Sequence, residues 1–119
     1  MPTENNSASN MYPEIDRLIH EPSRYNIMAL LYVVKRAEYL FVLNQTEMTS
    51  GNLTAHTAKL EKAGYLSIQK KFVLRKPKTF LSLTSRGRKA FEAYRDELKK
   101  LVNTPPGPGN VPSDTDKKN

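Results

Sequence analysis

Five cationic side chains stand within nine residues of the sequence, at Lys70, Lys71, Arg75, Lys76 and Lys78. Packing gives no reason for so many cations in one short segment, because their mutual repulsion opposes the folded state. Lysine does protect exposed strand edges from aggregation, but one or two residues usually suffice for that purpose. A phosphate backbone beside the segment would offset the repulsion, so these residues predict contact with a nucleic acid.

The distribution of charge along the whole chain also indicates an anionic partner. The 119 residues carry a net charge of +7. Residues 49–89 hold 10 Lys or Arg and a single acid, Glu61, whereas residues 1–48 are net negative and residues 90–119 are neutral. This asymmetry indicates a polyanionic partner; a merely solvated basic face is the alternative.

A helix is predicted over residues 50–63, immediately before the basic segment. Leu53, Thr57 and Leu60 recur at the helical period and define its inward face. The opposite face is small, polar or basic and carries no acid, so it can approach a DNA major groove closely. The alternative is an ordinary surface helix whose lysines lie near its C-terminal end, where the helix dipole favours them.

The outward residues of this helix predict contacts of different kinds. Asn52 can pair with an adenine edge, and Ala55 can touch a thymine methyl group. Lys59 and Lys62 can meet phosphates, and so can the helix start, because its backbone N–H groups are unpaired. The residues expected to contact DNA from this helix and its start are Thr49, Ser50, Asn52, Thr54, Ala55, Lys59 and Lys62.

His56 lies near the border of the inward face of the same helix. We expect it to be partly buried and bonded to backbone, with a phosphate contact as the alternative. A metal site is not expected, because the only other histidine is His20 and the chain has no cysteine.

The elements before this helix follow from apolar spacing. Helices are predicted over residues 13–20, over residues 22–36 and over residues 37–46, the last with Leu40 and Leu43 facing inward. Thr49 or Ser50 is expected to cap the 50–63 helix.

The elements after it begin at Gly64, a residue suited to the position that follows a helix. Alternating residues predict strands over 65–72 and 79–83, joined by the basic loop "VLRKPK". Thr84 or Ser85 is expected to cap a last helix that runs to about Val102. The fold predicted is mainly α with a small β-hairpin, a winged helix-turn-helix.

One domain is expected, over residues 12–102. Residues 1–11 are predicted to be a disordered lead, and residues 103–119, with 4 of the 8 prolines, a disordered tail.

The segments "GNLTAHTAKLEKAGYL" and "KPKTFLSLTSRGRKAF" resemble the winged-helix transcriptional regulators of the MarR and ArsR type, over roughly residues 13–100. The closest resemblance is to their small, stand-alone prokaryotic members, archaeal or bacterial. It implies a homodimeric regulator of transcription, with helix 50–63 in the major groove of double-stranded DNA and the wing, residues 70–78, on the adjacent backbone or minor groove. The chain departs from the pattern at Ala55, which is often polar or basic, and at Thr57, which is usually apolar. The second departure predicts either a slightly weaker core contact or a hydroxyl bonded back to the helix backbone.

The last helix carries apolar residues at spacings of 3, 4 and 3, which form a short seam. With the resemblance, this seam predicts a dimer interface between N-terminal and C-terminal helices; packing on the chain's own domain is the alternative. The interface residues expected are Ile15, Leu18, Ile19, Phe91, Tyr94, Leu98 and Leu101. The resemblance also leaves room for a small-molecule effector between this seam and the winged domain, although no residue names a ligand.

Several classes of function are not expected. With no cysteine, disulfides and thiolate metal sites are excluded. No apolar run approaches the roughly 20 residues of a membrane span, and no secretory signal is visible, so the cytoplasm is expected. No motif joins a nucleophile to a base, so we expect neither an enzyme nor a cofactor. The alternative function is a winged-helix module that binds proteins, or that binds DNA without sequence preference.

Overall fold

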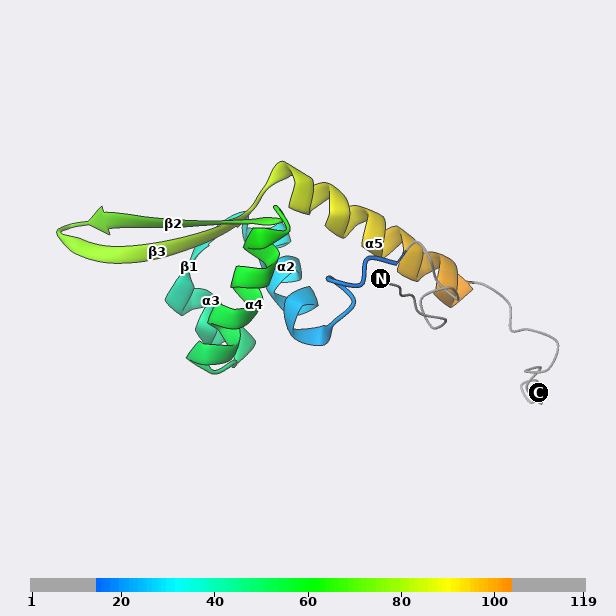
Figure 1. Ribbon diagram of the computed structural model, residues 1–119, viewed down its shortest axis with the longest axis horizontal. Helices are drawn as coiled ribbons and strands as arrows, with labels where there is room; N and C mark the ends of the chain where they lie inside the picture. Colours follow the sequence, from blue (N-terminus) through cyan, green and yellow to red (C-terminus); the bar gives the residue numbers. More distant parts are fainter. Residues whose placement is uncertain (1–14, 104–119) are drawn as a thin grey trace, which may run out of the picture.

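The computed structural model describes residues 15–103. Its elements follow the order α2 (Pro22–Val34), β1 (Arg36–Glu38), α3 (Tyr39–Thr46), α4 (Ser50–Lys62), β2 (Leu66–Val73), β3 (Lys76–Leu83) and α5 (Ser85–Asn103). Helices α2, α3 and α4 gather beside the base of a small sheet, and the β2–β3 hairpin and α5 extend from this body in opposite directions (Figure 1). Four helices with a small antiparallel sheet confirm the predicted mainly α winged helix-turn-helix. The lead at 1–11 lies outside the described residues, as does the tail beyond Asn103.

The sheet has the strand order β1-β3-β2, and both pairs are antiparallel. Strand β1 was not predicted, and the helix expected over 37–46 starts only at Tyr39. Lys35 ends α2 with a φ of 73°, which turns the chain so that Ala37 pairs with Leu81. The guanidinium of Arg36 then lies 4.2 Å from the centroid of the Phe80 ring. These contacts are tertiary, so local periodicity carries no sign of them.

The inward face of α3 also differs from the prediction. Leu40 is 61% exposed, Val42 is fully buried, and Leu43 is partly buried. The run Tyr39–Leu43 is almost entirely apolar, so its spacing does not select one face. The expectation that Leu40 faces inward was therefore wrong.

The helix predicted over 13–20 does not form in the described residues 15–20, which make a turn. The Asp16 carboxylate accepts hydrogen bonds from the backbone N–H groups of Leu18, at 2.9 Å, and Ile19, at 3.3 Å. Such local bonds compete with helix formation. The other carboxylate oxygen of Asp16 accepts from the Tyr65 hydroxyl. Burial, together with this bond, raises the pKa of Tyr65 to about 12.

Helix α4 matches its prediction closely. The Thr49 side chain caps it by accepting from the Asn52 N–H at 3.1 Å, and Gly64 follows it with a φ of +84°. Leu53, Thr57 and Leu60 are all buried. The Thr57 hydroxyl donates to the Leu53 carbonyl at 2.9 Å, so of the two alternatives expected for Thr57 the bond back to the helix backbone is the one that forms.

The wing is longer than predicted, because its loop contains only two residues. Leu74 and Arg75 connect β2 to β3 with φ values of 52° and 68°. Positive φ at both central residues is the pattern of a type I′ turn, which usually contains Asn or Gly. For a non-glycine residue this region costs about 1 kcal/mol or more. The sequence contains no such turn signal. The prediction of a six-residue loop, "VLRKPK", was therefore wrong, because four of its residues belong to the two strands.

Helix α5 begins where the chain passes close to the end of α4. The Thr84 hydroxyl accepts from the Gly87 N–H at 2.9 Å, which confirms a cap at this position. A Cβ atom on Gly87 would lie 2.0 Å from the carbonyl oxygen of Tyr65. Glycine is therefore required here by the close approach of two backbones.

Replacing Gly87 by alanine should lower the free energy of unfolding by at least about 3 kcal/mol, because the clash is with backbone and not with a flexible side chain. Gly51→Ala is the matched control, since nothing lies within 4 Å of a Cβ at Gly51. That change should raise stability by about 0.5 kcal/mol. Urea unfolding of both variants measures the difference; equal stabilities would contradict the packing of α5 on Tyr65.

Candidate nucleic-acid interface

The outward face of α4 is exposed along its length. Asn52, Ala55, Lys59 and Lys62 are all exposed, as is Gly51 at the start of the helix. The buried residues of the opposite face hold the helix against α2 and the sheet, so the outward face is free of intramolecular contacts to other elements. Its side chains are short at the N-terminal end and basic at the C-terminal end, the shape that allows a helix to enter a groove.

A hydroxyl cluster fixes the start of α4. The Tyr39 hydroxyl lies 2.9 Å from Thr54 Oγ1 and 3.1 Å from Ser50 Oγ, and it donates to the Ser50 carbonyl at 3.0 Å. Ser50 and Thr54 were predicted to contact DNA, and the structure shows them bonded to Tyr39 on α3. Tyr39 itself was missed, because its partners are 11 and 15 residues away in the sequence.

A second contact holds the middle of α4 from α2. The Arg24 guanidinium lies 3.2 Å from His56 Nδ1, and its Nε donates to the Leu18 carbonyl at 2.6 Å. Because arginine only donates, His56 Nδ1 is the acceptor in this contact. His56 is partly buried, as predicted, but its partner is a side chain, so the expected backbone bond was wrong.

The wing presents its cations on both faces. Side chains alternate along a strand, and Lys70 shares its face with Ile68, Thr79 and Leu81, which line a groove beside α4. The opposite face carries Lys71, Lys76 and Lys78, and Arg75 is in the turn.

Two of these lysines repel each other directly. Lys71 and Lys78 are cross-strand partners, a placement in which like charges are destabilising. Glu38 relieves part of the repulsion, because its Oε2 is 3.1 Å from Lys78 Nζ. Lys78 is thus less available to an external anion than the prediction assumed. Lys70, Lys71, Arg75 and Lys76 are exposed.

A groove of about 610 Å³ separates α4 from the wing. Its floor is the apolar pair Ile68 and Leu81, and its walls carry the Tyr39 cluster and Lys70. Glu61 is the acid in this lining, and it lies on the side of α4 that faces the wing. From α4 the groove is lined by Ser50, Thr54, Thr57 and Glu61, on the flank beside the outward face, and Lys70 is the wing cation in its lining.

A family model described as a winged helix DNA-binding domain matches residues 23–102. The chain belongs to the winged helix DNA-binding domain family. The winged helix DNA-binding domain implied by the resemblance is thereby confirmed.

Two of the similar proteins come from Methanocaldococcus jannaschii and Pyrococcus horikoshii. The uncharacterized protein MJ0432 of Methanocaldococcus jannaschii is 32% identical over 85 residues, which cover 71% of this chain and 92% of that protein. The structure of a transcriptional regulator homologue from Pyrococcus horikoshii has a TM-score of 0.71 and 24% identity, over 74% of this chain and 87% of that one. The structure of overoxidized AbfR bound to DNA has a TM-score of 0.61 and 15% identity, over 82% of this chain and 73% of that one. Both structures share the winged-helix fold.

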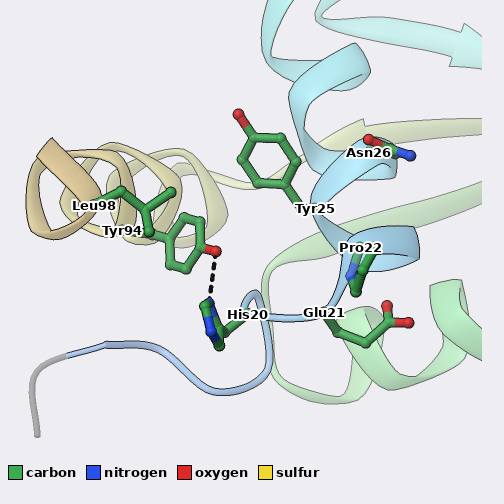
Figure 2. Close-up of a pocket in the computed structure, with 7 residues that line it drawn as sticks. All are labelled: His20, Glu21, Pro22, Tyr25, Asn26, Tyr94 and Leu98. Atoms are coloured by element: carbon green, nitrogen blue, oxygen red, sulfur yellow. Dashed lines mark hydrogen bonds between the residues drawn. The ribbon is translucent and has the colours of Figure 1, made fainter. Parts of the chain in front are cut away.

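A further groove in this winged helix lies between the N-terminal turn, α2 and α5, with a volume of about 330 Å³. His20 Nδ1 and the Tyr94 hydroxyl are 2.9 Å apart at its edge, and Tyr25 and Leu98 add apolar surface (Figure 2). Burial raises the pKa of the Tyr94 hydroxyl. Tyr94 and Leu98, two residues of the predicted dimer seam, line this groove, and the effector site expected between the seam and the winged domain stays a prediction. Among residues 15–103 no group of three or more His, Asp or Glu side chains could hold a metal ion.

The residues predicted for the dimer interface fall into two groups. Ile15, Ile19, Phe91 and Tyr94 are buried in the chain's own core, where Phe91 and Tyr94 pack against Tyr25 with ring centroids 5.4 and 5.8 Å from it. These four offer little surface to a partner. The other group, Leu18, Leu98 and Leu101, is partly buried and packs at the edge of the core.

The contact between Arg24 and His56 should couple α2 to α4 energetically. Arg24→Ala, His56→Ala and the double variant form a double-mutant cycle, from which we expect a coupling free energy of about 0.5–1.5 kcal/mol, because the pair is in direct hydrogen-bond contact. Urea unfolding gives the four stabilities. Arg24→Ala combined with Lys99→Ala is the control pair, and its effects should add. A coupling indistinguishable from zero for Arg24 and His56 would show that the bond does not position α4.

Proposed function

We propose that this winged-helix protein is a homodimeric transcriptional regulator that binds double-stranded DNA with sequence specificity. The observation that carries the proposal is the exposed, acid-free outward face of α4, which is followed directly by a hairpin with four exposed cations, Lys70, Lys71, Arg75 and Lys76. Such a surface complements a major groove flanked by phosphates. The membership of the chain in a family of DNA-binding domains supports it, as does the likeness of the fold to a regulator bound to DNA.

The roles of the residues follow from their positions on this surface. Asn52 and Ala55 read base edges from the exposed middle of the outward face of α4. Phosphates are held by Lys59 and Lys62 and by the free N–H groups at the start of α4, near Thr49. The further phosphate contacts come from the wing residues Lys70, Lys71, Arg75 and Lys76. Ser50, Thr54 and Lys78 already have partners within the chain, so they act mainly by positioning α4 and the wing.

The dimer is proposed to form through the projecting half of α5. Leu98 and Leu101 continue the apolar stripe of α5 past Tyr94 and are only partly buried at the edge of the core, and Val102 is 82% exposed. A helix of this length gains stability when it buries that stripe against a second copy. Leu18 borders the same edge. Two-fold symmetry would then place two α4 helices about 34 Å apart, on successive major grooves. A regulator of this kind acts where DNA is, in the cytoplasm of a prokaryotic cell.

The cations of the surface should control the salt dependence of binding. Replacing Lys59, Arg75 and Lys76 together by glutamine should weaken DNA binding and flatten the log–log plot of affinity against salt, by about 0.9 for each phosphate that the variant no longer neutralises. Fluorescence anisotropy at several salt concentrations measures both quantities. The matched control removes the same charge elsewhere, with Arg17, Lys35 and Lys99 replaced by glutamine. An unchanged slope in the first variant, or equal changes in both, would contradict the proposed surface.

Sequence preference is tested by selecting bound duplexes from a random DNA pool, with sedimentation of the free protein alongside. We expect a dimer and an enriched inverted repeat with half-sites about one helical turn apart. Leu98→Glu with Leu101→Glu should yield a monomer that retains its fold and loses the two-fold repeat. Salt-sensitive binding without any enriched motif would contradict sequence-specific regulation and favour binding without sequence preference.

A further inference from the structure

The tip of the wing carries apolar side chains among its cations. Leu74 is 91% exposed, the largest exposure of any large apolar side chain in residues 15–103, and Phe72 is 78% exposed. Phe72 pairs with Pro77 across the hairpin, so two apolar residues lie side by side in the second pair behind the turn, after Val73 and Lys76. The hairpin holds all of them well clear of the helical body (Figure 1). Nothing within the described chain covers this apolar tip, which we define as Phe72, Leu74 and Pro77.

The turn holds Leu74 in a conformation that leucine rarely adopts. Its φ is 52°, and that of Arg75 is 68°. A bulky residue at positive φ is an outlier, and asparagine or glycine would fit this turn without strain. Strained residues of this kind cluster where the strain serves a function. A stable fold therefore does not explain why leucine occupies the most projecting position of the wing.

The surroundings of the tip select its partner. Lys71, Arg75 and Lys76 flank it, and no Asp or Glu occurs between Glu61 and Glu92 in the sequence. An apolar protein surface would gain nothing from these cations, whereas a polyanion with an apolar interior matches both features. A DNA duplex is such a partner, because its phosphates line the grooves and its stacked bases are apolar between their edges.

We propose that Leu74 is an apolar wedge that enters the minor groove and partly unstacks a base step, so that binding bends the DNA. This inference rests on the proposed function and adds to it that the protein bends the DNA it binds. Arg75 and Lys76 would hold the two phosphate strands on either side of the groove, and Phe72 and Pro77, on the face of the wing that looks toward α4, would pack against the sugars. Apolar wedges of this kind kink duplexes toward the major groove. Pyrimidine–purine steps, which unstack most easily, are the expected site of the kink.

The substitution Leu74→Asn removes the apolar side chain of the wedge and keeps the conformation of the turn. Asparagine suits positive φ, so the turn is retained and the strain is relieved. We expect the variant to be more stable, with a Tm higher by roughly 4 °C, and to bend DNA much less. Leu74→Met keeps an apolar tip and should retain the bend. Val33→Asn is the control for surface apolarity, because Val33 is 76% exposed on α2 and does not belong to the wing.

Bending is measured by energy transfer between dyes at the ends of a duplex of about 30 base pairs with a central TA step. The duplex is the one enriched by selection or, if none is enriched, a mixed sequence at low salt. The wild type should bend it by roughly 20–90°. Leu74→Asn should lose most of this bend at a protein concentration that saturates the duplex, and Val33→Asn should keep it.

Other outcomes overturn the wedge. A wild type that binds and leaves the duplex straight, or a Leu74→Asn variant that bends it equally, would refute the wedge and leave the proposed regulator intact. A wild type that binds no duplex at all would refute both. Binding to vesicles with about one third anionic lipid that Leu74→Asn abolishes, with DNA bending unchanged, would make the tip a membrane contact instead.

Discussion

The close contact between Gly87 and the backbone of Tyr65 is the constraint on which the arrangement of the DNA-facing elements depends. The end of α4, the start of β2, the end of β3 and the start of α5 all meet there. Thr84 ties them together, because its hydroxyl donates to the Gly64 carbonyl and its backbone N–H donates to the Tyr65 carbonyl at 3.0 Å. The same hydroxyl accepts from Gly87 and caps α5. The angle between α4 and the wing is therefore set by a few bonds at one point, and small residues are needed there because the backbones nearly touch.

Sequence reasoning succeeded where an element is specified by its own residues. The inward face of α4 followed from Leu53, Thr57 and Leu60, because a buried stripe at the helical period has few alternative explanations. It failed where the decisive contact is distant. Strand β1 is three residues long and exists only through its pairing with β3, and the partners of Tyr39 and His56 lie on other elements. The two-residue turn of the wing was missed for a different reason, since Leu74 and Arg75 are not the residues that such a turn favours.

The candidate site likewise has features that local sequence specifies and features that depend on distant contacts. Its location and charge could be read from the sequence, because cations and small residues are concentrated in one segment. Which of those residues are free to bind could not be read, because that depends on neighbours. Ser50 and Thr54 are engaged by Tyr39, and Lys78 by Glu38. These internal partners do not weaken the site. They replace mobile side chains by fixed ones, so that less ordering is needed when the surface meets a ligand.

The N-terminal turn is linked to the wing directly and to α4 through Arg24 of α2. Its Asp16 bonds to Tyr65 at the base of the wing, and its Leu18 carbonyl accepts from Arg24, which in turn holds His56 on α4. His20 of the same turn meets Tyr94 of α5 beside the 330 Å³ groove. A displacement of the turn has to break its bonds to Arg24 of α2 or to Tyr65 at the base of the wing, and Arg24 is the residue that contacts α4. Because linkage between two sites is reciprocal, a ligand that prefers one position of the turn changes the free energy of DNA binding, and DNA changes the affinity for that ligand by the same factor. The groove beside His20 and Tyr94 is thus connected to α4 and to the base of the wing, the elements of the proposed DNA-binding surface, by hydrogen bonds of the N-terminal turn and of Arg24.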